Sequence, residues 1–271
     1  MSPSAARAAP PRRDCRESIV PEPISFDLPA IPAPYASPLL VGLSGGLDST
    51  VLLHRLAGDA ILRARGLRAI HVHHGLHADA DGWAEHCARL CASLGVALDV
   101  VRVAVARDAG DGLEAAARQA RHAAFESALR EGEVLALAQH RDDQAETFLL
   151  RALRASGVDG LAAMRPWRRC GRGWLWRPLL DVPRVALRAH AQAHELAWID
   201  DPSNDDDAHD RNFLRHRVMP SLQARWPHAG AALARAAALQ AEAAALLSDE
   251  DRAALASART VDRHCLHVDS L

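Results

Sequence analysis

Lysine is absent from the sequence, and all 32 of its basic residues are arginine. Without lysine the chain cannot form a Walker-type phosphate loop, which needs a Gly-Lys pair, or a Schiff base to a substrate carbonyl. The 34 acidic residues leave a formal net charge of −2, so the chain as a whole is not a polycation. Contact with a polyanion therefore depends on local clusters of arginine.

Cysteine is scarce and long apolar runs are missing. The five cysteines are odd in number and irregularly spaced, which argues against a disulfide framework. No run approaches the ~18 apolar residues of a membrane span, and the N-terminus lacks the apolar core of a secretory signal. We therefore expect a cytoplasmic protein with no membrane partner. The balance of 49% hydrophobic and 24% charged residues is typical of a globular fold.

Residues 39–56 hold the most informative pattern in the chain. A short apolar run, typical of a buried parallel strand, ends at Gly45 and Gly46, and a helix with Asp48 in its first turn follows. A strand, a glycine turn and a helix N-terminus bind phosphate well, because unpaired N–H groups and the positive end of the helix dipole face the same point. We therefore expect residues 44–49 to bind phosphate.

Strand and helix patterns alternate along most of the chain. Strands are predicted at 39–43, 67–73, 96–105, 133–138 and 174–176. Helical patterns lie between and after them. The first extends to about residue 65, a basic one that begins at Asp210 stops near Pro220, and the longest covers residues 227–247. This alternation predicts an α/β fold with a doubly wound, parallel, five-stranded sheet followed by a helical segment.

Composition divides the chain into three parts. Residues 1–37 are rich in proline, alanine and arginine without periodicity, so we expect a mostly disordered extension. Residues 38–223 hold the alternating pattern and form the predicted catalytic domain. Residues 224–271 begin with the alanine-rich helix and end with a strand-like segment at 265–268. We expect them to be a helical linker and the start of an incomplete C-terminal region.

Two further groups of polar residues follow predicted strands. His73 ends the second strand, while His140, Asp142 and Asp143 follow the fourth. Ligands of open α/β sheets bind at the carboxyl ends of strands, so we expect these residues and the glycine turn to line one crevice. The two acids also suit a helix cap, but we favour a chemical role. Strand alternation argues against a metal site among the histidines of residues 71–77, for which we prefer a polar pocket wall.

Charge is unevenly distributed along the chain. Residues 151–190 carry nine arginines and two acids, and residues 200–210 then carry six aspartates. The basic stretch either contacts a phosphate backbone or is a solvated face, and both interpretations stay open. Arg118 has two similar interpretations, because it can pair with Glu114 on one helix or join Arg121 in a basic edge that faces a phosphate.

A set of short motifs occurs in an order that is highly specific. The motifs are Ser44-Gly45-Gly46-Leu47-Asp48-Ser49, His71 to Leu76, Glu114 to Arg121, His140 to Thr147, Arg177 to Leu180, Asp201 to Asn204 and Asp210 to Arg215. The first resembles the Ser-Gly-Gly-x-Asp-Ser signature of PP-loop ATP pyrophosphatases. The ordered set, which spans residues 38–260, resembles the tRNA(Ile)-lysidine synthetase family.

The resemblance implies a ligase that forms a carbon–nitrogen bond in tRNA. In that family the carbon-2 oxygen of a wobble cytidine attacks the α-phosphate of ATP and releases pyrophosphate. The side-chain amine of free lysine then displaces AMP to give lysidine. The implied partners are ATP, Mg²⁺, free L-lysine and a tRNA(Ile) with a cytidine wobble base. The sequence does not define the oligomeric state, for which a homodimer is one option.

The resemblance also implies roles for individual residues. The implied ATP-binding residues are Ser44, Gly45, Gly46, Leu47, Asp48, Ser49, His73 and Arg118. The implied catalytic residues are Asp48, Asp143 and Arg211, and the two acids are also the candidate Mg²⁺ ligands. Arg211 would neutralise charge that develops on the α-phosphate. The implied substrate-binding residues are His140, Asp142 and Arg215. Either Asp142 or Asp143 would hold Mg²⁺ or the incoming ammonium group of lysine.

The sequence departs from the family pattern in two places. The family often has two histidines before the aspartate pair, and the first position here is Gln139. Family members continue into domains that hold the tRNA, whereas this chain stops at Leu271, so we expect a fragment or a truncated form. Two other functions are weighed. A tRNA 2-thiolase usually needs a Cys-x-x-Cys pair, which is absent, and a non-catalytic ATP-binding module would not need Arg211 or the aspartate pair.

Overall fold

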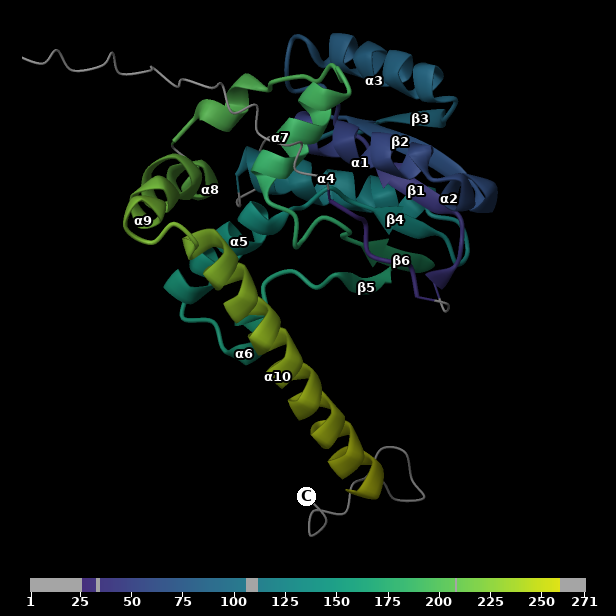
Figure 1. The fold of residues 1–271 in the computed structure, drawn as a ribbon. Helices are drawn as coiled ribbons and strands as arrows, with labels where there is room; N and C mark the ends of the chain where they lie inside the picture. Colours follow the sequence, from purple (N-terminus) through teal and green to yellow (C-terminus); the bar gives the residue numbers. More distant parts are fainter. Residues whose placement is uncertain (1–25, 33–34, 106–111, 208, 259–271) are drawn as a thin grey trace, which may run out of the picture.

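A six-stranded sheet forms the centre of the computed structural model, which describes residues 26–32, 35–105, 112–207 and 209–258 (Figure 1). The strands lie in the order β3-β2-β1-β4-β6-β5. Their bounds are β1 Leu39–Gly42, β2 Leu67–His73, β3 Ala97–Arg102, β4 Val134–Ala136, β5 Trp167–Cys170 and β6 Gly173–Trp176. Five strands run parallel, and only β5 pairs antiparallel, with β6.

The predicted doubly wound parallel sheet is confirmed, but the number of strands is six rather than the predicted five. The missed strand, β5, is an edge strand that pairs through the register Trp167↔Trp176 and Cys170↔Gly173. It has one bonded neighbour and carries two exposed arginines, so its four residues show no apolar run or long alternation. Such a short edge strand depends on its partner rather than on its own sequence pattern.

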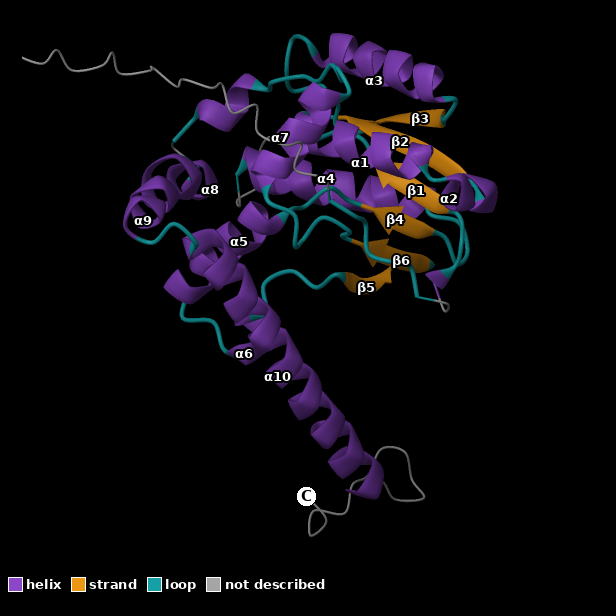
Figure 2. Ribbon diagram, viewed as in Figure 1, coloured by secondary structure: helices purple, strands orange, loops and turns teal. Residues whose placement is uncertain are grey.

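Helices cover both faces of this sheet (Figure 2). One face packs against α1 Leu47–Gly58, α2 Ala60–Arg65, α3 Ala80–Leu94 and α7 Arg184–Ala193. The other face packs against α4 Leu113–Ala128. The side chains of β1 show the division, because Leu39 and Val41 join the first apolar cluster and Leu40 joins the second. Alternate strand residues point to opposite faces, so a strand buried on both sides is apolar throughout.

A helical region lies beside the carboxyl edge of the sheet and is built from segments that follow β4 and β6. It comprises α5 Arg141–Leu153, α6 Val158–Leu161, η2 Pro202–Asp205, α8 Asp210–Phe213, η3 Leu214–Val218, α9 Met219–Arg225 and α10 Ala229–Ala258. α10 packs on α5 and α6 and then extends away from the sheet (Figure 1). Among the described residues, no helix combines the length and the apolar character that crossing a bilayer would require.

Two helix boundaries differ from those predicted. The helix after the glycine turn was expected to reach residue 65, but it ends at Gly58, and Asp59 caps a separate α2 by accepting N–H bonds from Ile61 and Leu62 at 2.9 and 3.0 Å. A stop was also expected near Pro220. Pro220 instead lies within a continuous helical run, because η3 leads directly into α9 with Val218 and Met219 both in the right-handed helical conformation.

Part of the N-terminal segment that we expected to be disordered packs on the domain. Phe26, Leu28 and Ile31 lie partly buried against the apolar cluster on the α1 side. The ring of Tyr35 stacks on Trp167, with ring centroids 4.4 Å apart. These apolar residues are spaced irregularly, so the segment shows neither helix nor strand periodicity in the sequence. The rest of the predicted extension, residues 1–25, and the predicted strand at 265–268 lie outside the described residues.

Candidate active site

The carboxyl edge of the sheet opens onto a cavity of about 440 Å³. Residues that follow β1, β2 and β4 line it, together with residues of α4, α7 and the region from η2 to η3. The cavity brings together many of the residues singled out in the sequence, namely Ser44, Gly46, Leu47, Asp48, Ser49, Arg118, Asp143, Arg211 and Arg215. The strand ends thus converge as expected for an open α/β sheet.

The glycine turn closes on itself through two serines. Ser49 Oγ accepts the N–H of Ser44 at 3.2 Å and donates to the carbonyl oxygen of Gly46 at 3.1 Å. α1 then begins without a side-chain cap, so N–H groups of its first turn stay available to a ligand. Gly45 has φ of 87°, and a Cβ atom there would lie 2.8 Å from Ile199 Cδ1, so this position requires glycine.

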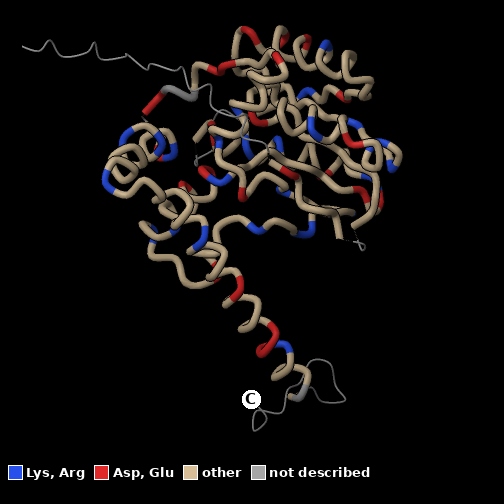
Figure 3. Tube along the Cα trace, viewed as in Figure 1, with Lys and Arg blue, Asp and Glu red and all other residues tan. Residues whose placement is uncertain are grey.

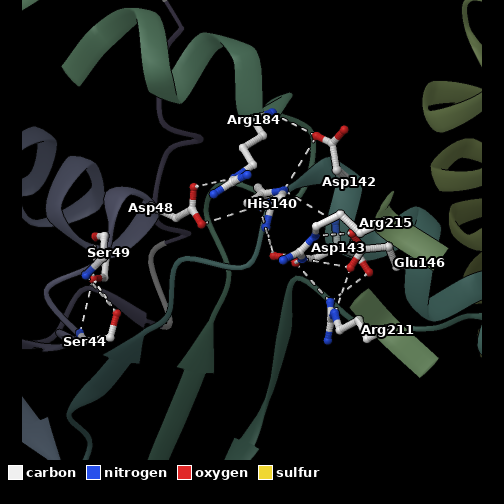
Figure 4. Close-up of polar contacts among 11 residues, drawn as sticks. Ser44, Asp48, Ser49, His140, Asp142, Asp143, Glu146, Arg184, Arg211 and Arg215 are labelled. Atoms are coloured by element: carbon white, nitrogen blue, oxygen red, sulfur yellow. Dashed lines mark hydrogen bonds and ion pairs between the residues drawn. The ribbon is translucent and has the colours of Figure 1, made fainter. Parts of the chain in front are cut away.

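Asp48 lies in the first turn of α1 and faces Arg184, the first residue of α7 (Figure 4). Asp48 Oδ1 and Arg184 Nε are 3.7 Å apart, and neither of these buried atoms has a hydrogen-bond partner among the residues that the structure describes. The backbone N–H of Arg184 donates to Asp142 Oδ2 at 2.8 Å, which fixes the start of α7 beside the cavity. Sequence reasoning missed Arg184, although its place directly after Pro183 marks a helix start.

His140 and Asp142, the two predicted substrate-binding residues that follow β4, lie behind the cavity rather than in its lining. His140 is 1% exposed and caps α5, with its ring nitrogens 3.5–3.6 Å from oxygens of Asp48, Asp142 and Asp143. Burial alone would lower the pKa of the His140 imidazole, but these three carboxylates together raise it. Asp142 holds the start of α7. Both residues therefore support the cavity wall.

Asp143 and Glu146 bind two arginines in a closed network (Figure 4). Arg211 Nε and Arg215 Nε each donate to Glu146 at 2.8 Å, and their Nη2 atoms donate to Asp143 Oδ1 at 3.0 and 3.1 Å. Burial would raise the pKa of Asp143, but His140 and the arginines lower it. Glu146 is buried and was missed as a site residue, although its spacing of three from Asp143 on one helix indicates a shared face.

The two arginines of α4 face the cavity without a carboxylate partner. Arg118 and Arg121 line the cavity and form no ion pair in the described part of the chain. Glu114, one predicted partner of Arg118, lies instead 3.1 Å from His209 Nδ1. Loss of surrounding water and the nearby Arg211 lower the pKa of Arg118. This arrangement favours a basic edge formed by Arg118 and Arg121 over a surface ion pair of Arg118 with Glu114. β5 carries two further arginines (Figure 3).

His73, a predicted ATP-binding residue, points away from the cavity. Its Nε2 lies 3.1 Å from Asp81 Oδ1, which also accepts an N–H of Arg102 at 2.6 Å. His71 lines the cavity in its place, and its Nδ1–H donates to the carbonyl oxygen of Leu43 at 2.9 Å. Burial lowers the pKa of His71, so its imidazole is neutral. Within the described ranges, no group of three His, Cys, Asp or Glu side chains is arranged to hold a metal ion.

The model of the PP-loop domain matches residues 28–222. The chain belongs to the PP-loop family. A tRNA(Ile)-lysidine synthase of Xanthomonas campestris pv. campestris (strain 8004) is 66% identical over 221 residues, 82% of this chain and 51% of that protein. One of Xylella fastidiosa (strain 9a5c) is 57% identical over 228 residues, 84% of this chain and 52% of that protein. The chain thus spans about half the length of the curated relatives it matches.

A solved structure shares the PP-loop fold at much lower identity. The U34-tRNA thiolase NcsA from Methanococcus maripaludis superposes with a TM-score of 0.56 at 16% identity. The match covers 74% of this chain and 70% of the thiolase. This similarity shows the fold alone.

Proposed function

We propose that this chain carries the adenylating and ligating centre of a tRNA(Ile)-lysidine synthase. The proposed reaction is the one named for these relatives, tRNA(Ile)-lysidine synthesis. The observation that carries the proposal is the cavity itself, where, among the described residues, the buried Asp48 Oδ1 accepts no hydrogen bond and the arginines of α4 form no ion pair. A polyphosphate with a divalent cation would satisfy both, because it offers anionic oxygens to the arginines and a positive charge to the acid.

The proposed reaction has two steps, and the cavity has groups for each. The carbon-2 oxygen of the wobble cytidine attacks the α-phosphorus of ATP, and pyrophosphate leaves. N–H groups at the start of α1 and the Arg118 guanidinium hold the departing phosphates. Arg211 neutralises charge on the α-phosphate. The amine of lysine then attacks carbon 2, and AMP leaves with the former base oxygen.

The residues present fit one Mg²⁺ ion. Proteins usually bind Mg²⁺ through one or two carboxylates together with phosphate oxygens and water. Asp48 Oδ1 is the proposed donor, because it is buried and accepts no hydrogen bond. Both oxygens of Asp143 already accept N–H bonds, one from His140 and one from the two arginines. A bound Mg²⁺ would supply charge neutralisation for the departing pyrophosphate.

Asp143 is better suited to the second substrate. Of the two acids considered for the incoming ammonium group, Asp143 lines the cavity and Asp142 does not. We therefore assign the lysine side of the cavity to Asp143 and the metal side to Asp48. His140 lies between these carboxylates and keeps them apart, with its Nε2 3.6 Å from Asp48 and 3.5 Å from Asp143.

The decisive experiment combines the protein with ATP, radiolabelled lysine and tRNA(Ile) bearing a cytidine wobble base. We expect label in the RNA only when all three are present, with one AMP and one pyrophosphate released for each lysine. A tRNA with a uridine wobble base is the control. ATP binding without release of pyrophosphate would instead indicate a non-catalytic module. Sulfur transfer to the RNA would indicate a thiolase, although the sequence has no Cys-x-x-Cys pair.

A further inference from the structure

Gln139 lines the cavity and contacts a buried cation, the guanidinium group of Arg177. It follows β4, lies directly before α5 and lines the cavity. Its Oε1 accepts a hydrogen bond from Arg177 Nε at 3.0 Å. Arg177 follows the neighbouring strand β6, is 8% exposed and also donates from Nη1 to the carbonyl oxygen of Arg165 at 2.7 Å. Two adjacent strands thus fix the pair.

The contact with Arg177 determines which way the Gln139 amide points. A guanidinium group has only hydrogen-bond donors, so the amide oxygen must face it and the amide nitrogen must face the other way. Burial and the neighbouring Arg168 and Arg118 lower the pKa of Arg177 to about 10, which still leaves a cation at neutral pH. The orientation therefore follows from chemistry and does not depend on telling oxygen from nitrogen by position.

The amide nitrogen of Gln139 is left with two unused N–H groups. In the described part of the chain, only its oxygen takes part in a hydrogen bond. Because Arg177 occupies one side of the amide and the cavity lies on the other, these donors face the cavity. The arginines that line the same cavity are charged, whereas Gln139 is neutral. A neutral, fixed donor suits a base better than a phosphate.

We propose that Gln139 is a specificity residue that donates a hydrogen bond to N3 of the wobble cytosine, and that Arg177 is its positioning residue. This inference rests on the proposed function. Cytosine has an acceptor at N3, beside the carbon-2 oxygen that reacts, whereas uracil has an N–H there. An amide held with its nitrogen toward the base attracts the acceptor and opposes the N–H, so it selects cytidine over uridine.

The first test compares two anticodon stem–loop RNAs that differ only at the wobble base. Rates of ATP-dependent pyrophosphate release give kcat/KM for the cytidine RNA and the uridine RNA. For Gln139→Leu we expect kcat/KM on the cytidine RNA to fall by about 10- to 100-fold, with little change on the uridine RNA. Gln192→Leu, on an exposed position of α7, is the matched control and should keep both rates.

A second variant reverses the hydrogen bond rather than removing it. Gln139→Glu places an ionised carboxylate beside Arg177, and that group can only accept hydrogen bonds. We expect it to lower the cytidine-to-uridine ratio further than Gln139→Leu does, because it attracts the N–H of uracil and repels N3 of cytosine. The new ion pair with Arg177 should keep the fold intact, which a thermal melt verifies.

Arg177 is tested through the same ratio. Arg177→Lys keeps a group that only donates, so the amide stays oriented and the ratio is retained. Arg177→Met frees the amide to rotate, so we expect the ratio to fall by about tenfold. A purely structural role of Arg177 would lower both rates together and leave the ratio unchanged. Rescue by lysine but not by methionine therefore identifies the positioning effect.

The outcomes separate this inference from the proposed function. Wild-type lysine incorporation combined with an unchanged ratio in Gln139→Leu overturns the inference and leaves the proposed function standing. The inference is also overturned if Gln139→Leu lowers both rates equally, since the amide then serves phosphate or structure. A wild-type protein that incorporates no lysine into either RNA overturns both, whereas a selective loss on the cytidine RNA supports both.

Discussion

The two walls of the cavity differ in how their charges are paired. On the α1–α7 wall, Asp48 Oδ1 and Arg184 Nε are buried 3.7 Å apart and neither forms a hydrogen bond. On the α5–η3 wall, Glu146 accepts donors from Arg211 and Arg215 at 2.8 Å. Both walls carry acidic and arginine side chains. Those of the α5–η3 wall form hydrogen bonds with one another, whereas the facing atoms of the α1–α7 wall do not.

This difference indicates which wall is built for a ligand. A buried charged atom without a partner is costly, so it persists where something else will satisfy it. The α1–α7 wall meets that description and lies beside the glycine turn. The α5–η3 wall instead has its charges matched internally, which holds its arginines in place before a ligand arrives. Pre-positioned groups of this kind need little reorganisation during a reaction.

Removing the carboxylate that pairs the two arginines of the α5–η3 wall should have the largest effect on stability. In Glu146→Ala, two partly buried arginines lose their shared carboxylate, and we expect the free energy of unfolding to fall by about 3 kcal/mol. Urea unfolding measures this change. Glu85→Ala is the control, because Glu85 forms an exposed pair with Arg89 and should change stability by at most about 0.5 kcal/mol. Equal effects of the two variants would contradict a closed network around Glu146.

The open wall should respond in the opposite way, with activity lost and stability kept. Asp48→Asn removes a charge whose Oδ1 accepts no hydrogen bond, so the fold should remain intact. We expect lysidine formation to fall by at least ~10²-fold, the usual loss for a key electrostatic group. Lysine incorporation into tRNA measures this rate, and a thermal melt verifies the fold. Near-normal turnover by purified Asp48→Asn would refute the role of this acid.

Arg184 should give a smaller effect on the same wall. In Arg184→Met the neighbouring Asp48 keeps its charge, but a guanidinium group is lost from the cavity. We expect kcat/KM for ATP to fall by about tenfold, the size of one charge-assisted hydrogen bond. Arg188→Met, one turn along α7 and exposed, is the matched control. If both variants retain full activity, Arg184 contributes nothing to ATP binding.

The sequence was sufficient to predict the elements that depend on local pattern. The glycine turn, the presence of five parallel strands and the place of Asp48 all follow from short motifs and apolar runs. Arg184 and Glu146 could not be found in that way, because their importance comes from contacts across distant segments. Glu146 meets Arg211 from a helix 65 residues away. The family resemblance pointed to His73, which ends β2, whereas His71 on the same strand face lines the cavity, and only packing decides which of the two reaches it.

The last prediction concerns the stability of the α1–α7 wall. Its two helices also meet in a histidine cluster, where His54 Nδ1 and His190 Nε2 lie 3.1 Å apart and His194 is adjacent. Burial, His194, His54 and Arg55 lower the pKa of His190 to about 4. The unfolded chain binds that proton near pH 6.5, so stability is fully present above about pH 6.5 and falls as the pH drops toward about 4.

Urea unfolding at about pH 7 and pH 5 measures this effect, with an expected loss of about 1 kcal/mol from His190 after solvent screening. Asp27, His54 and Asp59 line the same hollow. In His190→Gln the loss between the two pH values should shrink, whereas the exposed control His228→Gln should keep it. An unchanged loss in His190→Gln would show that acid does not act on the wall through this residue. A reduced loss would place the acid-sensitive contact between α1 and α7, the same two helices that carry Asp48 and Arg184.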